Sequence, residues 1–256
     1  MGLIDTHCHL YLEEFDADRE ERILAARDSG VEMILVPNVD LSTIDRMHEL
    51  CDNHPDFAVP MMGLHPTSVD TDYVSQLSVM ESLLQTRAYC AIGEIGIDLY
   101  WDKTRLSEQK AAFETQLRWS IDLDLPVVIH TRDAFSEVFD VINKVGPERL
   151  KGVFHSFSGT VSDLKEIEQF GDFKLGIGGV VTYKNSKLPE VIAQTDIRHI
   201  VLETDSPYLP PVPFRGKRNE PLYIWETAAK VAMIYEMELE KIVKITRQNS
   251  LEVFFK

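Results

Sequence analysis

The sequence is poor in cysteine, which excludes a disulfide framework. It contains three cysteines, Cys8, Cys51 and Cys90, so the number is odd, and no two of them form a CxxC pair. We expect small buried thiols at these positions, as is usual for an intracellular protein.

Long apolar runs are also lacking. No stretch approaches the roughly 20 apolar residues that span a bilayer. The N-terminus has no basic segment followed by an apolar stretch, so no signal peptide is expected. These absences predict a cytoplasmic protein without a membrane segment.

Positive charge is scarce. The chain has 26 Lys and Arg against 42 Asp and Glu, for a net charge of −16. Proteins that bind nucleic acid non-specifically are usually basic, so overall charge cannot hold a polyanion here. If the substrate is an anion, metal ions or a small basic patch must supply local positive charge.

The chain has the length and composition of one globular domain. It has 256 residues, of which 44% are hydrophobic and 27% charged, and it shows no internal repeat. An α/β barrel commonly occupies about 250 residues as one unit. We therefore predict a single domain over residues 1–256.

A recurring unit of apolar run, polar turn and amphipathic stretch predicts the fold. Eight apolar runs begin near Leu3, Val31, Phe57, Tyr89, Pro126, Gly152, Phe173 and His199. Between the fifth and sixth runs, helical spacing is shown by Phe135, Val138, Phe139, Ile142 and Val145, and Gly146-Pro147 ends this helix. The alternation predicts parallel pairing, and eight apolar strands predict a closed (β/α)8 TIM barrel of the α/β class.

An open doubly wound sheet is the structural alternative. Neither a GxGxxG motif after the first strand nor a P-loop is present to support it. From about Pro221 onward, two extra C-terminal helices are expected to pack outside the barrel.

Potential metal ligands gather at the predicted carboxyl ends of the strands, where barrel enzymes place their chemistry. In chain order these ends carry Asp5, His7, His9, His65, Glu94, His130, His155, Glu203 and Asp205. Five of the eight histidines are in this set. That bias indicates a site rather than chance, although an HxH pair or His65 alone would be weak evidence.

The spacing of these residues favours two metal ions. Residues two apart on a strand face the same side, so His7 and His9 can face the axis while Cys8 points away. His7 and His9 can form one metal site with a carboxylate, and His130 and His155 can form a second. Glu94 can bridge the two metal ions. Imidazole and carboxylate suit Zn²⁺, Mn²⁺ or Fe²⁺, and carboxylate with water suits Mg²⁺.

Two further carboxylates are expected to support the ligands. Asp5 could bind a metal directly, but we expect it to orient a neighbouring histidine from behind. Asp133 is a candidate for the same task in the loop around His130.

The order of five motifs resembles the TatD-type deoxyribonucleases of the amidohydrolase superfamily. The motifs are DTHCH, GEIGID, HTRD, HSFSG and ETDSPYL, beginning at residues 5, 93, 130, 155 and 203. The resemblance covers essentially the whole chain. It implies a (β/α)8 barrel with two divalent ions that hydrolyses phosphodiester bonds of DNA, typically as a 3'-5' exonuclease.

The resemblance also implies which residues of this sequence bind the metals, by their positions in the matching motifs. One metal would be bound by His7, His9, Glu94 and Asp205, and the other by Glu94, His130 and His155. Glu203 would join a site when a further metal or substrate binds.

Three residues are assigned roles in the reaction. Asp205 is our choice of general base, because it can hold water while touching a metal. His65 would bind substrate or steady the leaving oxygen. Arg132 would contact phosphate, unless it forms an ion pair with Asp133 or another nearby acid.

The segment SPYLPPVPFRGKRNEP, residues 206–221, should lie at the barrel mouth because it follows the last strand. Its cations are Arg215, Lys217 and Arg218, and nearby aromatic surfaces are Tyr208, Phe214, Tyr100 and Trp101. Bases can stack on such rings while cations follow the backbone. The alternative is a solvated loop with packed aromatics.

Three rival functions remain open. An ester or amide hydrolase, such as an aminoacyl-tRNA deacylase, could use the same metals, although Glu94 stands where many binuclear amidohydrolases carry a lysine. A barrel phosphomonoesterase shares only the HxH start. A metal-stabilised binding module would more often use cysteine ligands. A monomer acting on DNA without an obligate protein partner is the expected form.

Overall fold

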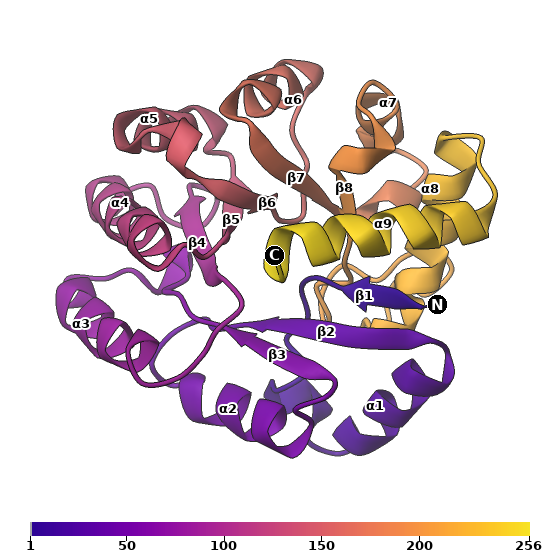
Figure 1. The fold of residues 1–256 in the computed structure, drawn as a ribbon, viewed down its shortest axis with the longest axis horizontal. Helices are drawn as coiled ribbons and strands as arrows, with labels where there is room; N and C mark the ends of the chain where they lie inside the picture. The colour runs from indigo at the N-terminus through magenta and orange to yellow at the C-terminus, as the bar shows by residue number, and fades with distance from the viewer. Residues whose placement is uncertain (1) are drawn as a thin grey trace.

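Eight parallel strands with helices around them form a (β/α)8 barrel in a computed structural model that describes residues 2–256 (Figure 1). All eight predicted strands are present, so the predicted fold class is confirmed. Their bounds are β1 Leu3–Asp5, β2 Val31–Pro37, β3 Ala58–Met61, β4 Ile92–Asp98, β5 Val127–Arg132, β6 Lys151–Phe154, β7 Asp172–Ile177 and β8 Ile200–Leu202.

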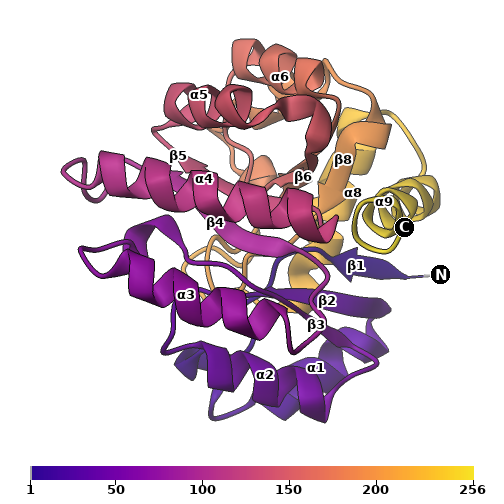
Figure 2. The same cartoon turned by 60° about the vertical axis from the view of Figure 1, so that its left-hand side comes forward.

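The helices form an outer layer around the strands (Figure 2). The α-helices are α1 Arg19–Asp28, α2 Ile44–Asn53, α3 Tyr73–Leu84, α4 Leu106–Leu123, α5 Phe135–Val145, α6 Val161–Ile167, α7 Leu188–Ile192, α8 Ile224–Ile234 and α9 Leu239–Phe254. Short 3-10 helices lie at Glu13–Phe15, Pro66–Ser68, Pro147–Arg149, Glu168–Phe170, Gly179–Thr182, Ile197–His199 and Pro221–Tyr223. No helix in residues 2–256 combines the length and the apolar character that a membrane crossing needs.

The hydrogen-bond ladder of the barrel has two seams. One ladder joins β1 to β3 in order, and another joins β4 to β8. A single bridge, Met62 to Ile92, connects β3 with β4. Between β8 and β1 the Thr6 N–H donates to Leu202 O at 3.0 Å. The strands therefore surround one axis, but within the described residues the ladder is interrupted, unlike the continuous closure that we expected.

The last helix closes the amino-terminal end of the barrel. Val253 and Phe254 of α9 pack in one cluster with inward side chains of the strands, namely Ile4, Leu35, Met61, Val128, Val153 and Val201. The two predicted C-terminal helices are present, but α9 differs from the expectation because its end enters the core. This apolar plug leaves the opposite end of the barrel for polar chemistry.

Candidate metal centre

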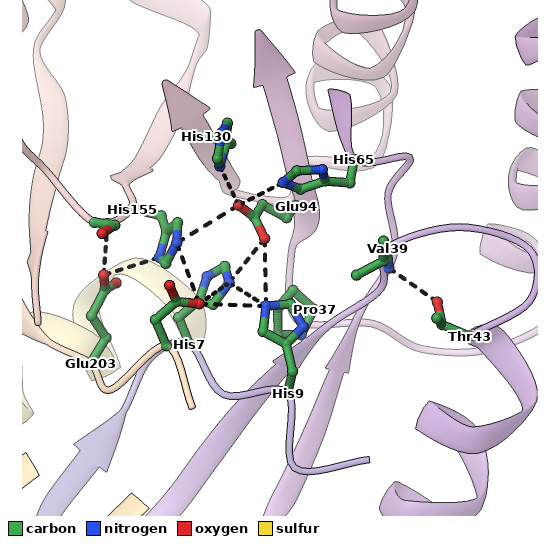
Figure 3. A network of polar contacts seen from close by, with 12 residues as sticks. His7, His9, Pro37, Val39, Thr43, His65, Glu94, His130, His155 and Glu203 are labelled. Carbon is green, nitrogen blue, oxygen red and sulfur yellow. Dashed lines mark hydrogen bonds and ion pairs between the residues drawn. The ribbon is translucent and has the colours of Figure 1, made fainter. Parts of the chain in front are cut away.

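The predicted ligands meet at the carboxyl ends of the strands (Figure 3). His7 and His9 follow β1, Glu94 and His130 lie within β4 and β5, and His155 directly follows β6. All of these side chains are buried or nearly so.

One cluster contains the two histidines of the first motif. The Nε2 atoms of His7 and His9 are 3.1 Å apart. Oε2 of Glu94 lies 3.0 Å from the His7 nitrogen and 3.7 Å from the His9 nitrogen. Oδ1 of Asp205 lies 3.9 Å and 3.6 Å from the same two atoms. His7 and His9 therefore face the same point, as their spacing predicted.

The other oxygen of Glu94 faces a second cluster. Its Oε1 lies 2.8 Å from His130 Nδ1, 3.4 Å from His65 Nε2 and 3.7 Å from His155 Nε2. Figure 3 shows Glu94 between the two groups of imidazoles. A carboxylate with one oxygen toward each cluster has the geometry of a bridging ligand.

The donor set fits divalent cations. Atoms bound to one tetrahedral Zn²⁺ at 2.0–2.2 Å lie roughly 3.3–3.6 Å apart, close to the spacings within these clusters. Within residues 2–256, three groups of donors could hold an ion: His7 with His9 and Glu94, His7 with His155 and Glu203, and His65 with Glu94 and His130. The structure thus groups His130 with His65, whereas His155 lies with His7 and Glu203. Three buried polar atoms of the centre, His7 Nδ1, His155 Nδ1 and Glu203 Oε2, have no hydrogen-bond partner. Such orphaned groups are costly unless an ion or water completes them.

The protonation of four of the five imidazoles suits ligation. Burial lowers the pKa of His7, His9, His65 and His155, so these rings are neutral at pH 7. A neutral imidazole has the lone pair that a metal needs.

The carboxylates show the cost of burying negative charge. Burial raises the pKa of Asp205 to about 7, and that of Glu203 likewise to about 7. Burial also opposes ionisation of Glu94, but the surrounding histidines hold its pKa well below the usual range. A divalent cation would relieve the unfavourable burial of these charges.

A residue that sequence reasoning missed fixes the orientation of His9. The Tyr11 hydroxyl donates its proton to Pro37 O at 2.9 Å. Its oxygen is therefore an acceptor for His9 Nδ1, which lies 3.1 Å away. With the proton on Nδ1, the lone pair of His9 Nε2 points into the first cluster. The only sequence signal for this role was the spacing: Tyr11 comes two residues after His9, and residues two apart on a strand face the same side.

His130 is held by Asp98, not by Asp133. Its Nε2 lies 2.9 Å from Asp98 Oδ2, while Nδ1 faces Glu94. Burial opposes protonation, but hydrogen bonds to the two carboxylates raise the pKa of His130 to about 9. Asp98 ends the GEIGID motif, so the sequence contained this partner without identifying it.

Glu203 stands behind His155. Its Oε1 lies 3.0 Å from His155 Nδ1 and accepts the Ser156 N–H at 2.6 Å. Room for this carboxylate comes from Gly176 of β7, where an added Cβ would overlap Glu203 Oε2. His155 Nδ1 has no hydrogen-bond partner, so Glu203 is a close neighbour of this ring whose Oε2 remains available to a cation.

The expected role of Asp5 is corrected. Its carboxylate accepts hydrogen bonds from Thr204 N at 2.9 Å and Thr204 Oγ1 at 2.6 Å. Its contact with His7 is to the backbone N–H, at 3.3 Å, not to the ring. Asp5 therefore ties the end of β1 to the segment after β8 and so positions Asp205 rather than an imidazole.

His65 is arranged as a hydrogen-bond donor. The Thr67 backbone N–H donates to its Nδ1 at 3.2 Å. A backbone N–H can only donate, so the proton of the neutral ring is on Nε2, which faces Glu94. This tautomer fits the predicted contact with substrate or leaving oxygen better than it fits metal ligation.

The predicted substrate-binding residues divide into two groups. Tyr208 lies beside the centre, with its ring 6.1 Å from that of His9. Arg132 rests its guanidinium on Tyr100 instead of pairing with Asp133. Arg215 and Lys217 are exposed, and Arg215 lies over the Tyr183 ring.

Arg218 is a correction to the expected basic patch. Its guanidinium forms two hydrogen bonds with Asp18, at 2.9 and 2.7 Å, and lies 3.4 Å from Glu220. Because these carboxylates already neutralise it, Arg218 ties the loop to the start of α1 and is not free for phosphate.

A (β/α)8 barrel with imidazoles and carboxylates collected at its strand ends defines a metal-dependent hydrolase. The model of the TatD related DNase family matches residues 4–255. The chain belongs to this family.

Relatives and solved structures agree with this assignment. YabD of Bacillus subtilis, described as an uncharacterized metal-dependent hydrolase, is 38% identical over 259 residues, covering 98% of each chain. The crystal structure of YjjV, a TatD homolog from Escherichia coli, has a TM-score of 0.92 at 30% identity, covering 98% of this chain and 97% of that one. A TatD family hydrolase from Entamoeba histolytica shares the fold, with a TM-score of 0.87 at 22% identity, covering 100% and 98% of the two chains.

Proposed function

We propose that the chain hydrolyses phosphodiester bonds of DNA with two divalent cations, as a 3'-5' exonuclease acting on single strands or ends. The observation that carries the proposal is Glu94, whose two oxygens face two different groups of buried imidazoles. Two-ion centres of this kind support in-line displacement at phosphorus.

The ligands divide between the two positions. His7, His9, Glu94 and Asp205 would hold one ion, and Glu94, His130 and His155 the other. Glu203 is a further ligand in reserve, because its Oε2 has no partner. When bound, Mg²⁺, Mn²⁺ or Zn²⁺ polarises a phosphate oxygen and lowers the pKa of water.

The chain's own groups would move the protons. Oδ1 of Asp205 lies between the two clusters, 3.6 Å from His9 Nε2 and 3.8 Å from His155 Nε2. That position suits a general base for the attacking water. The Nε2–H of His65, which lies 3.4 Å from Glu94 Oε1, suits a donor to the leaving oxygen.

Local cations would guide the strand to this centre. Arg132 is exposed at the end of β5, and Arg215 and Lys217 are exposed on the segment that follows β8. Tyr208, which is 49% exposed beside His9, offers a ring at the same mouth. All the proposed site residues come from one chain, so we propose that a cytoplasmic monomer suffices.

One parallel assay tests the proposal. Purified protein with Mg²⁺ or Mn²⁺ is given single-stranded DNA, duplex DNA, an aminoacyl ester and a phosphomonoester. We expect cleavage of single-stranded DNA from the 3' end, with loss of activity in Glu94→Ala. Intact DNA together with cleavage of the ester, lost in Glu94→Ala, would instead establish the ester hydrolase.

A further inference from the structure

Two aromatic rings are exposed at the barrel mouth directly after β4. Tyr100 is 54% and Trp101 70% exposed, and their ring centroids are 5.0 Å apart. Rings of this size usually bury most of their surface. The loop follows the strand that carries Glu94, so these rings lie at the same end of the barrel as the metal centre.

A cation from the neighbouring strand extends this surface. The guanidinium carbon of Arg132 lies 3.7 Å from the Tyr100 ring centroid and 5.6 Å from that of Trp101. Arg132 is two residues beyond His130 on β5 and pairs in register with Asp98. Arg132 is therefore on the same face of β5 as His130, the proposed metal ligand. The ion pairs found in residues 2–256 do not include Arg132, which leaves its N–H donors available.

One buried carboxylate fixes the loop relative to the metal centre. Oδ1 of Asp98 accepts the backbone N–H groups of Tyr100, at 2.9 Å, and Trp101, at 3.3 Å. Its Oδ2 faces His130. Gln109 of α4 holds the Asp98 backbone on both sides, accepting its N–H at 2.9 Å and donating to its carbonyl at 3.2 Å. The backbone that carries the rings is therefore held in a set position relative to His130.

We propose that Tyr100, Trp101 and Arg132 form a stacking platform that binds an unpaired base of a single strand while its phosphate lies at the metal centre. The inference rests on the proposed function and adds how the strand is selected. A ring stacks on any base, whereas a base in a duplex is already covered by its neighbours. The platform thus favours single strands and frayed ends over intact duplex.

Binding of two matched strands tests the platform. One is a labelled thymidine oligonucleotide and the other an abasic strand of equal length and charge, both with phosphorothioate linkages that resist cleavage. We expect Trp101→Ala to bind the thymidine strand roughly 5- to 100-fold more weakly and the abasic strand as the wild type does. Trp101→Phe should restore most of the affinity, because it keeps a ring.

A control variant separates stacking from general loss of exposed aromatic surface. Phe255 is 44% exposed and directly follows the α9 residues that plug the opposite end of the barrel. Phe255→Ala should bind both strands normally. Wild-type protein that binds both strands equally, or Trp101→Ala that keeps full affinity for thymidine, overturns the platform. So does a Trp101→Ala variant that changes only the oligomeric state, since the ring would then serve a protein interface.

Cleavage of unmodified strands, measured in parallel, keeps the two proposals apart. Protein that cleaves neither strand overturns the proposed nuclease, whatever Trp101→Ala does to binding. Protein that cleaves DNA but shows no dependence on Trp101 overturns the platform alone.

Discussion

A histidine binds a metal through one ring nitrogen, and the partner of its other nitrogen decides which one that is. In this chain Tyr11 fills that place for His9 and Asp98 for His130. At the scale of single residues, these partners determine whether the ligands are ready for a cation.

Tyr11→Phe should weaken divalent-metal binding by roughly 10- to 100-fold. The change removes the acceptor for His9 Nδ1 and frees the ring to adopt the other tautomer. Calorimetric titration of the chelated protein with Mn²⁺ measures the effect. Tyr89→Phe is the matched control, because it removes a 2.9 Å contact between a tyrosine and His48 elsewhere in the fold. Equal affinities in the two variants would contradict this role for Tyr11.

His7→Ala should lose bound metal and activity, while Cys8→Ser should retain both. The His7 nitrogen faces the cluster, whereas the Cys8 thiol is buried in the apolar core. Elemental analysis of the purified variants, with a thermal melt to confirm folding, checks the expectation. Metal loss in a folded Cys8→Ser protein would show that the thiol is a ligand.

At the scale of elements, Gly176 of β7 has no side chain and so leaves room for the carboxylate of Glu203. Gly176→Ala should displace Glu203, disturb His155 and destabilise the fold by about 1–3 kcal/mol. The free energy of unfolding and the Mn²⁺ affinity measure these effects. Gly178 is the matched control, because a Cβ there would lie 3.7 Å from Glu203 O, an ordinary contact without overlap. Similar losses in Gly178→Ala would mean that the overlap with Glu203 at Gly176 is not the cause.

The same scale explains what the strand pattern predicted. Apolar β-branched runs are needed wherever helices cover the outside of a parallel sheet, so all eight strands were visible in the sequence. The two seams in the ladder and the entry of α9 into the core depend on which backbone groups meet. No pattern of neighbouring residues predicts which distant backbone groups will pair.

At the scale of the whole molecule, the charge of −16 makes the placement of a few cations important. Arg215→Ala combined with Lys217→Ala should weaken binding of single-stranded DNA. It should also reduce the slope of log affinity against log salt by about 1.4, since each phosphate contact contributes about 0.7 for single strands. Fluorescence anisotropy at several salt concentrations measures both quantities.

Lys241→Ala combined with Lys244→Ala removes the same charge from α9. We expect a slope close to that of the wild type, because this helix packs at the amino-terminal side of the barrel. Equal effects of the two double variants would show that overall charge, not the mouth, controls binding.

The sequence by itself determined the strands, the end of the barrel that carries the chemistry and the identity of the metal-ligand candidates. These follow from periodicity and from residues such as His7, His9 and Glu94, whose types and order are visible without coordinates. Only the tertiary structure decided which partner each side chain has. Tyr11 behind His9, Asp98 between His130 and the aromatic loop, Asp5 on Thr204 and Arg218 on Asp18 are all such choices. Except for Tyr11, they join residues far apart in the chain or on separate strands and loops. Hydrogen bonding depends on distance and direction in space, which spacing along the chain does not specify.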